Sequence, residues 1–296
     1  MTQTIETLSR RTEAMQGIRS IVHTMKTLSA INAHPYEQAA RSIGAWSDTV
    51  MDGFQAFFHQ HRGLDLAIAP DALPVIIVFG SDQGLCGNYN EVVTAAVATQ
   101  PGAGANPHIL CIGAQMEDAL TGAGLPVSAT LMPPASADGL GRLASDLVTH
   151  IDAVDGATPR DITVTLAFMK RAAQGQQAAV TQRILPLSPL LIDQLANRPW
   201  TSRSLPFFNM PAAMVFSALM RNYLFASLFR AAAEALVTEN AARLLRMQQA
   251  ERSIDDRLAE LQSQSHSARQ TAITEELLDI ISGFEALKPR KAHRAY

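Results

Sequence analysis

Near the end of a very long helical pattern, the chain reads Ser267-Ala268-Arg269-Gln270-Thr271-Ala272-Ile273-Thr274-Glu275-Glu276-Leu277. The pattern runs from Ala212 to Leu287 without a proline, and Gly283 is its only glycine. A helix of this length would reach roughly 110 Å, whereas the mean globular helix has about 11–12 residues. A chain of 296 residues cannot bury all of it. We therefore predict a mechanical element, such as a coiled coil or a shaft, that runs through something else.

Apolar residues in both terminal segments follow the heptad rhythm of a coiled coil. In residues 3 to about 60, steps of three and four join Ile18, Ile21, Met25 and Leu28. In the last segment, one seam contains Ile254, Leu258, Leu261, Ser265, Ala268 and Ala272. A second seam, shifted by one residue, contains Ile273, Leu277, Ile280, Phe284 and Leu287. We predict an antiparallel pair of terminal helices, with a bend in the first of them near Ala33–Pro35.

The end of the chain combines an apolar helix with a basic tail. Residues 273–287 are too apolar to face water, so either the chain's own domain or an apolar collar of a partner should cover them. Beyond Leu287 the last nine residues carry four basic side chains and no acidic one. Pro289 disfavours helical geometry in the residue before it, so we predict a non-helical tail.

The middle of the chain alternates short apolar runs with helical stretches. Predicted strands cover residues 75–79, 108–112, 127–131, 161–168 and 178–185. Predicted helices between them cover residues 90–99, 115–121 and 140–155. This alternation indicates an α/β sheet domain of Rossmann-like type. The predicted domains are coiled-coil helices at 1–60 and 210–287, the α/β domain at 70–205 and the basic tail at 288–296.

Composition excludes several functional classes. A net charge of −3 lacks the basic balance typical of nucleic-acid-binding domains. Two cysteines, Cys86 and Cys111, are too few for a disulfide framework and fit a reducing compartment. The most apolar stretch, residues 212–237, contains three charged side chains, which argues against a membrane span. We predict a soluble protein, without a signal peptide, that can still sit on a membrane complex.

One turn occupies a position at which phosphates often bind. Gly80-Ser81-Asp82-Gln83-Gly84-Leu85-Cys86-Gly87 follows a predicted strand and precedes a predicted helix. It matches neither the G-x-x-x-x-G-K-[ST] nor the G-x-G-x-x-G pattern, so we interpret it as a tight turn. Cys86 is interpreted as a small packed side chain rather than a nucleophile, and no Cys or His spacing resembles a metal site. The sequence predicts no catalytic residue, no cofactor and no metal.

Three groups of residues resemble the gamma subunit of rotary F-type ATP synthases, their central stalk. The long helix carries Glu239-Asn240-Ala241-Ala242-Arg243, then the run from Ala268 to Leu277, then Ile281-Ser282-Gly283. The turn Asp82–Gly87 is similar to the family's Asp-Arg-Gly-Leu-Cys-Gly turn, and Met25 falls where the family has the Met of a Lys-Ala-Met motif. The signature of the long helix is highly specific.

The resemblance implies an architecture and a function. The paired terminal helices would lie inside a hexamer of alternating alpha and beta subunits, with the α/β domain beside the epsilon subunit and the membrane c-ring. Ion flow would turn the ring and the shaft, and the shaft would force each beta subunit through its nucleotide states. The chain itself would do no chemistry and bind no nucleic acid. The implied location is the cytoplasmic face of the bacterial inner membrane.

The resemblance also implies contact residues. Positions that touch the alpha/beta hexamer in the family correspond here to Met25, Arg243, Arg269, Gln270, Thr274 and Glu276. Because an arginine can fork onto a carboxylate, Arg243 and Arg269 are expected to affect coupling more than folding. Phe208 and Asn209 stand where the family faces the ring.

Departures from the family indicate a divergent paralogue. Asn32-Ala33-His34-Pro35-Tyr36 replaces a stretch rich in Lys and Arg, and Gln83 replaces an Arg. A stalk subunit of a second, sodium-translocating and mainly hydrolytic ATPase therefore remains an alternative. The specific helix signature argues against a non-rotary coiled-coil scaffold. The missing phosphate loop argues against a nucleotide-binding α/β enzyme.

Overall fold

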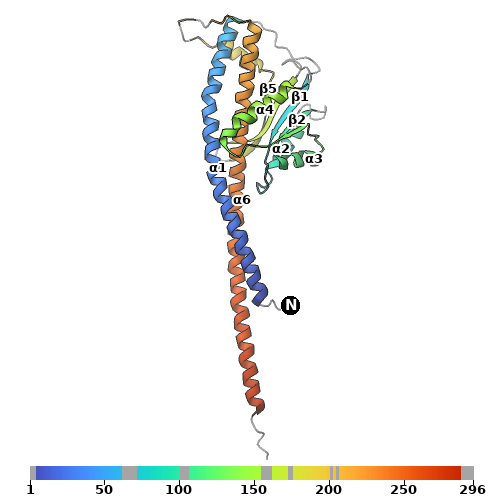
Figure 1. The fold of residues 1–296 in the computed structure, drawn as a ribbon, viewed down its shortest axis with the longest axis vertical. Coiled ribbons are helices and arrows are strands. Elements are labelled where there is room, and N and C mark those ends of the chain that lie inside the picture. The colour runs from blue at the N-terminus through green and yellow to red at the C-terminus, as the bar shows by residue number, and fades with distance from the viewer. Residues whose placement is uncertain are drawn as a thin grey trace, which may run out of the picture. The chain divides into compact units, whose positions relative to one another are not determined.

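The computed structural model describes residues 5–61, 72–100, 107–154, 162–172, 176–200, 203–204 and 207–287. Two long helices are α1 (Ile5–Gln60) and α6 (Ala212–Leu287). The strands are β1 (Leu73–Phe79), β2 (His108–Ile112), β3 (Ala129–Leu131), β4 (Ile162–Arg171) and β5 (Gln177–Leu185). Shorter helical elements are α2 (Tyr89–Ala98), α3 (Ala114–Gly122), the 3-10 turn η1 (Ala137–Gly139), α4 (Leu140–Asp152) and α5 (Pro189–Asn197). The predicted α/β fold with long terminal helices is confirmed (Figure 1).

Contacts divide the chain into two units. The shaft unit comprises residues 1–26 and 247–296, and the sheet unit comprises residues 27–246. Each long helix therefore contributes residues to both units. The domain boundaries predicted from the sequence instead assign each long helix to a domain of its own. The predicted basic tail at 288–296 lies outside the described residues.

The sheet has the strand order β3-β2-β1-β4-β5. Strand β1 pairs in parallel with β2 and β4, and β2 pairs in parallel with β3. Only β5 runs antiparallel, against β4. The chain first extends the sheet from β1 toward β3 and then returns to the other side of β1. The junction of β1 and β4 is therefore a topological switch point, next to which open α/β sheets usually bind ligands.

Alternating side chains of the strands build a separate core on each face of the sheet. On one face, Ile76 and Val78 pack with apolar residues of α2 and α3. On the other face, Val75 and Ile77 pack with α4 and with the parts of α1 and α6 that belong to the sheet unit. All four β1 side chains are 2% exposed or less. This burial on both faces explains why β1 reads as a continuous apolar run rather than as an alternating one.

Aromatic side chains hold α1 and α6 together within the sheet unit. Phe54 is fully buried and makes edge contacts with Phe216 and Tyr223 of α6, at 6.2 and 6.0 Å between ring centroids. Helix α1 continues through Pro35, as the predicted helix of residues 3 to about 60 requires, and the bend near this proline stays a prediction. The adjacent Tyr36 is 4% exposed and donates a hydrogen bond to the Pro134 carbonyl at 2.9 Å. We infer that this packing outweighs the hydrogen bond that the proline removes.

The seam of the shaft unit centres on three apolar residues. Val22 of α1 packs with Met247 and Ile254 of α6, and each is less than 10% exposed. Around them lie the partly buried residues Met15, Met25, Ala250 and Leu258. The contribution of Met25 and the α6 seam through Ile254 and Leu258 are thus confirmed.

The α1 side of the predicted seam was largely wrong. Ile18, Ile21 and Leu28 are 48%, 62% and 52% exposed. They form a stripe with heptad spacing next to the stripe of Met15, Val22 and Met25, which faces α6 in the shaft unit. Both stripes have steps that suit a coiled coil, so the spacing alone does not tell which one meets the partner helix.

Ion pairs flank this seam and fix the direction of pairing. Arg19 bonds Asp255 at 2.6 Å, whereas Lys26 and His23 bond the two carboxylate oxygens of Glu251 at 2.5 and 3.0 Å. Residue numbers rise along α1 as they fall along α6, so the helices run antiparallel, as predicted. The hydrogen bonds from Lys26 and His23 lower the pKa of Glu251 from 4.5 to about 2.

Acid is expected to weaken the helix pairing in the shaft unit. Because the folded-state pKa of Glu251 is depressed, its stabilising effect is present above pH 4.5 and is lost as the pH falls toward 2. Hydrogen exchange at Val22 and Ile254, corrected for intrinsic rates, should therefore accelerate across this window. In Glu251→Gln the acceleration should shrink. Glu6→Gln, which alters an exposed pair within one turn of α1, should behave as wild type, and equal acid responses in all three proteins would contradict the prediction.

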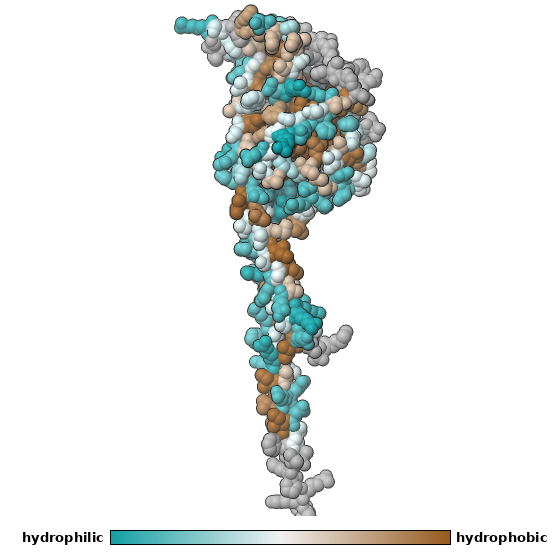
Figure 2. All heavy atoms as spheres, viewed as in Figure 1, coloured by the Kyte–Doolittle hydropathy of each residue, from teal (hydrophilic) through white to brown (hydrophobic). Residues whose placement is uncertain are grey.

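The second predicted seam of α6 faces outward. Ile273, Leu277 and Ile280 are 58%, 54% and 51% exposed, and their neighbours Leu278 and Ile281 are equally open. Figure 2 shows hydrophobic residues on the surface of this end of the helix. These side chains are therefore uncovered within the shaft unit. Their cover by the chain's own domain or by an apolar surface of a partner stays a prediction.

Candidate functional site

Five polar residues of α6 that are buried or partly buried are called the belt here: Glu234, Thr238, Glu239, Asn240 and Arg243. Glu234 and Thr238 bond residues of β4, and Arg243 bonds the turn that follows β1. Thr238 is 0% exposed, and Glu239, Asn240 and Arg243 are 5%, 6% and 8% exposed. Buried polar groups are costly unless they are hydrogen-bonded. The hydrogen-bond partners of the belt residues therefore show which parts of the chain this segment of α6 contacts.

Arg243 reaches across to the turn that follows β1. Its Nη2 donates to the Gln83 carbonyl at 3.1 Å, and its Nε donates to the Gly84 carbonyl at 3.4 Å. Nη2 also pairs with Glu239 Oε1 at 2.5 Å. The guanidinium thus joins a carboxylate of its own helix to two main-chain carbonyls of the sheet domain. This is the bidentate geometry that arginine favours.

Thr238 connects the same segment of α6 to three other elements. Its hydroxyl lies 3.1 Å from the Met169 carbonyl of β4 and 3.1 Å from the Tyr89 hydroxyl of α2. The Tyr89 hydroxyl donates to the Ala235 carbonyl at 2.9 Å. Gln177 of β5 donates to the Thr238 carbonyl at 3.1 Å. Through these bonds Thr238 contacts β4, which is one of the two strands at the switch point.

The charges of the belt are balanced within the chain. Burial raises the pKa of the Glu239 carboxyl, and the adjacent Arg243 opposes this shift. Burial also raises the pKa of the Tyr89 hydroxyl, so Tyr89 serves as a neutral hydrogen-bond donor. These groups support one another, and their arrangement fits a structural contact better than acid–base chemistry.

The turn of residues 80–87 is anchored from several sides. Asn90 accepts from the Ser81 amide at 3.0 Å and donates to the Ser81 hydroxyl at 2.8 Å. Cys86 is buried, with its sulfur 3.4 Å from the Ser81 hydroxyl, which agrees with a packed side chain. Leu85 has a φ of +67°, the only positive φ of a non-glycine residue in the described part of the chain. Its side chain is 58% exposed.

A charge network ties β4 to both long helices within the sheet unit. Arg171 donates to Glu37 of α1 at 2.8 Å and to Glu234 of α6 at 3.5 Å. Arg171 and then Arg41 lower the pKa of Glu37 to about 2. Glu234 Oε2 is buried and has no hydrogen-bond partner among the described residues.

The residues expected to contact the hexamer fall into two structural classes. Arg269, Gln270, Thr274 and Glu276 are exposed on α6 in the shaft unit. Met25 is half-buried in the seam. Arg243 lies in the sheet unit and is bonded within the chain, so the structure does not bring it together with the other expected contacts. A contact of Arg243 with a beta subunit stays a prediction, and it would require the guanidinium to exchange its present acceptors.

The residues expected to face the ring also differ from one another. Phe208 stacks on Phe57 at 6.2 Å and tilts against His61 at 5.4 Å, so its ring belongs to the core. Asn209 is exposed. The more prominent surface residue is Phe207, which is 89% exposed. Sequence reasoning missed Phe207, because the spacing in this loop does not distinguish two adjacent phenylalanines.

The beginning of α6 is the most apolar part of the chain. By length and composition alone, a window of α6 within residues 212–283, with a mean hydropathy of 1.3, could cross a membrane. In the structure, Phe216 and Tyr223 from this part pack against Phe54. Arg221 from the same part pairs with Asp152 of α4. Core packing within the sheet unit accounts for part of the apolar sequence, because 22% of this window is buried.

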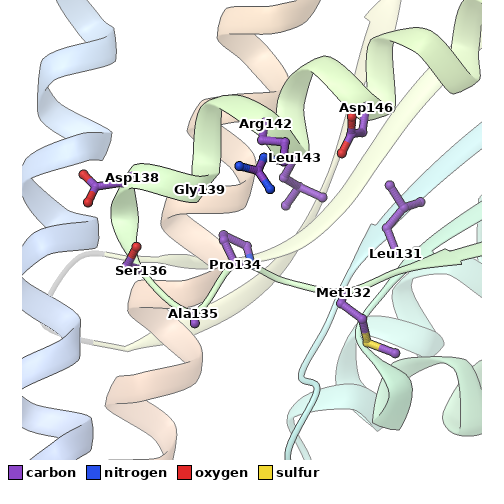
Figure 3. A pocket seen from close by; sticks show the side chains of 10 residues that line it. All are labelled: Leu131, Met132, Pro134, Ala135, Ser136, Asp138, Gly139, Arg142, Leu143 and Asp146. Atoms are coloured by element: carbon purple, nitrogen blue, oxygen red, sulfur yellow. The ribbon is translucent and has the colours of Figure 1, made fainter.

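A groove of about 610 Å³ lies where β3 leads into η1 and α4 (Figure 3). Its charged lining consists of Asp138, Arg142 and Asp146, all exposed. Two carboxylates beside one guanidinium disfavour a phosphate, so the groove lacks the features of a nucleotide site. In the described part of the chain, no three His, Cys, Asp or Glu side chains gather in a way that could hold a metal ion.

Comparison with known proteins identifies relatives along nearly the whole chain. A family model described as ATP synthase matches residues 4–287. An ATP synthase gamma chain of Cupriavidus pinatubonensis is 26% identical over 292 residues, covering 93% of this chain and 96% of the relative. A gamma chain of Nitratidesulfovibrio vulgaris is 27% identical over 221 residues, covering 72% of this chain and 73% of the relative.

Solved structures share the fold. A chain in the Euglena gracilis mitochondrial ATP synthase, in a structure of its OSCP, F1 and c-ring parts, aligns with a TM-score of 0.66 and 16% identity, covering 99% of this chain and 98% of its own. A chain in the rotor of the same enzyme aligns with a TM-score of 0.62 and 14% identity, covering 91% of this chain and 98% of its own. At these identities the likeness concerns the fold alone.

Proposed function

Because the chain belongs to the ATP synthase family, and the relatives described above are gamma chains, we propose that it is the rotating central-stalk subunit of an F-type ATP synthase. The observation that carries the proposal is the family match over residues 4–287, which includes both long helices and the sheet. The proposed partners are the alpha and beta subunits of the catalytic hexamer, the epsilon subunit and the membrane c-ring. Ion flow through the ring would turn the shaft and change the nucleotide states of the beta subunits.

The exposed end of α6 supports this role. Ile273, Leu277 and Ile280 are more than half exposed on a helix that extends away from its partner helix. Contiguous apolar surface of this kind marks a protein interaction site. A collar formed by the hexamer would bury it. A contact made in only one angular state would favour that state by its differential energy.

The chain is part of an ATPase complex, and we propose that it contributes no catalytic group to it. The buried belt and the charged groove offer neither a phosphate loop nor an activated nucleophile among the described residues. As a gamma subunit the chain would be a peripheral part of a membrane-bound complex. We place it on the cytoplasmic face of the bacterial inner membrane.

Co-expression tests the proposal directly. A tagged chain should bring down alpha and beta subunits of its own organism in a three-to-three ratio, together with epsilon. The isolated chain should hydrolyse no ATP. A coiled-coil scaffold would not recover the hexamer, and turnover by the pure chain that a substitution in it abolishes would overturn the non-catalytic assignment.

Arg269→Ala is expected to change turnover without changing the stability of the chain. The side chain is exposed, so its loss should alter the free energy of unfolding by no more than about 0.5 kcal/mol. Inside the hexamer the same side chain would be desolvated beside a carboxylate, and removing one partner of such a pair costs about 2–5 kcal/mol. Thermal unfolding of the chain and ATP hydrolysis by the complex measure the two effects. Arg142→Ala, on α4, is the control, and unchanged turnover and ion pumping in Arg269→Ala would contradict the expectation.

A further inference from the structure

Side chains of α6 make hydrogen bonds beside the crevice that the switch point of the sheet defines. Open α/β sheets bind their ligands outside the carboxyl ends of the strands, where the strand order reverses. Here that place lies between the ends of β1 and β4. Beside it, the Arg243 guanidinium bonds the Gln83 and Gly84 carbonyls of the turn that follows β1, and Thr238 bonds the Met169 carbonyl near the end of β4.

The turn on the β1 side is held in a strained conformation. A bulky residue such as Leu85 rarely adopts a φ of +67°. Such strain persists only where the surrounding structure fixes the backbone. Asn90 fixes the turn at Ser81, and Asp82 accepts from the Ala114 amide at 3.4 Å. Immediately before Leu85, the Gln83 and Gly84 carbonyls are held by Arg243.

We propose that Arg243 is a positioning residue that fixes the 80–87 turn to α6 beside this crevice. A force on the sheet then passes to the helix through a charge-assisted contact rather than through apolar packing alone. The shaft part of α6 begins at Met247, four residues beyond Arg243. The consequence for coupling rests on the proposed rotor function, whereas the consequence for the turn does not.

The chemistry of the contact requires an arginine. Nη2 and Nε bond two successive carbonyls while Nη2 also meets Glu239. A lysine ammonium can keep the Glu239 pair, but a single nitrogen lacks the planar fork that spans both carbonyls. The acceptor on Gln83 is its main-chain oxygen. The presence of Gln83 where the family has an arginine therefore leaves the contact intact.

Hydrogen exchange of the isolated full-length chain tests the positioning role. In Arg243→Lys the Ser81 amide, which donates to Asn90 within the turn, should exchange about tenfold to a hundredfold faster, as expected when the turn loses its hydrogen bonds to a charged group. Amides of Ile77 and Leu110 in the central strands should exchange at the wild-type rate. Two matched controls should leave the turn unchanged: Gln83→Ala, which removes only a side chain, and Arg252→Lys, an exposed arginine of α6. If Arg243→Ala folds, added ethylguanidinium should restore protection of the turn.

The assembled complex tests the consequence for coupling. The Arg243→Lys complex should hydrolyse ATP but pump fewer ions per ATP than wild type. Wild-type exchange in the turn of Arg243→Lys would overturn the proposal, and so would a loosened turn combined with wild-type pumping per ATP. Failure of the wild-type chain to assemble with alpha and beta subunits would instead refute the rotor function. The hydrogen-exchange test of the turn would keep its meaning, because it uses the isolated chain.

Discussion

Replacing Arg243 with alanine is expected to lower the free energy of unfolding of the isolated chain by about 3–5 kcal/mol. The substitution leaves Glu239, which is 5% exposed, without its charge partner. It also leaves the Gln83 and Gly84 carbonyls without their donor. For the exposed Arg269 the sequence-based expectation of a coupling effect without a folding effect stands. For Arg243 burial adds a folding effect that the sequence did not indicate.

Denaturant unfolding of Arg243→Ala, Arg252→Ala and Arg243→Ala/Glu239→Gln measures this effect. The double variant should regain part of the loss, because it removes the unpaired carboxylate. Burial already raises the pKa of Glu239, and losing Arg243 removes the group that opposes this shift. The carboxyl then stays protonated in the folded state to higher pH. The deficit of Arg243→Ala should therefore grow as the pH rises, and a deficit that is absent or independent of pH would contradict this account.

Gly113→Ala is expected to destabilise the sheet unit by about 2–6 kcal/mol, the sum of backbone strain and overpacking. Gly113 joins β2 to α3 with a φ of +101°, which side-chain-bearing residues rarely adopt. A Cβ at this position would lie 2.5 Å from the Ser81 carbonyl oxygen and 3.0 Å from the Asp82 nitrogen. Both are main-chain atoms of the turn that Arg243 holds, so neither can move without disturbing it.

Gly141 provides the control for this substitution. It lies in α4, and a Cβ added there would meet no atom within 4 Å. Gly141→Ala should stabilise the chain by about 0.5–1 kcal/mol, because alanine favours a helix over glycine. Thermal unfolding of both variants gives the comparison. Equal melting temperatures for Gly113→Ala and wild type would contradict the prediction, because the added Cβ would then fit beside Ser81 and Asp82 without a clash.

The elements of the fold could largely be predicted from local pattern. The β2 strand was predicted at its observed bounds, residues 108–112, because four apolar residues follow His108 between loop signals. Helix α5 was missed, although Pro189 occupies a position favourable for a helix start. Nine residues are too few to show a clear helical period.

The site could be predicted only in part. The signature Glu239-Asn240-Ala241-Ala242-Arg243 pointed to the right segment of α6, but not to its burial against the turn of residues 80–87. A charged side chain is normally assigned to the surface, and the bond that buries Arg243 spans 160 positions in sequence. Local periodicity contains no information on such a partner. The same limitation explains why Phe208 and Phe207 could not be told apart.

The antiparallel pairing of the two chain ends has a consequence for synthesis on the ribosome. Arg19 meets its partner Asp255 across 236 positions of sequence. At about 5–20 residues per second, translation needs about 10–50 s to deliver that partner. During this interval Val22 and Met25 have no helix to pack against, although the sheet can already form. The shaft part of the first helix therefore stays without its intramolecular partner until the last part of the chain emerges.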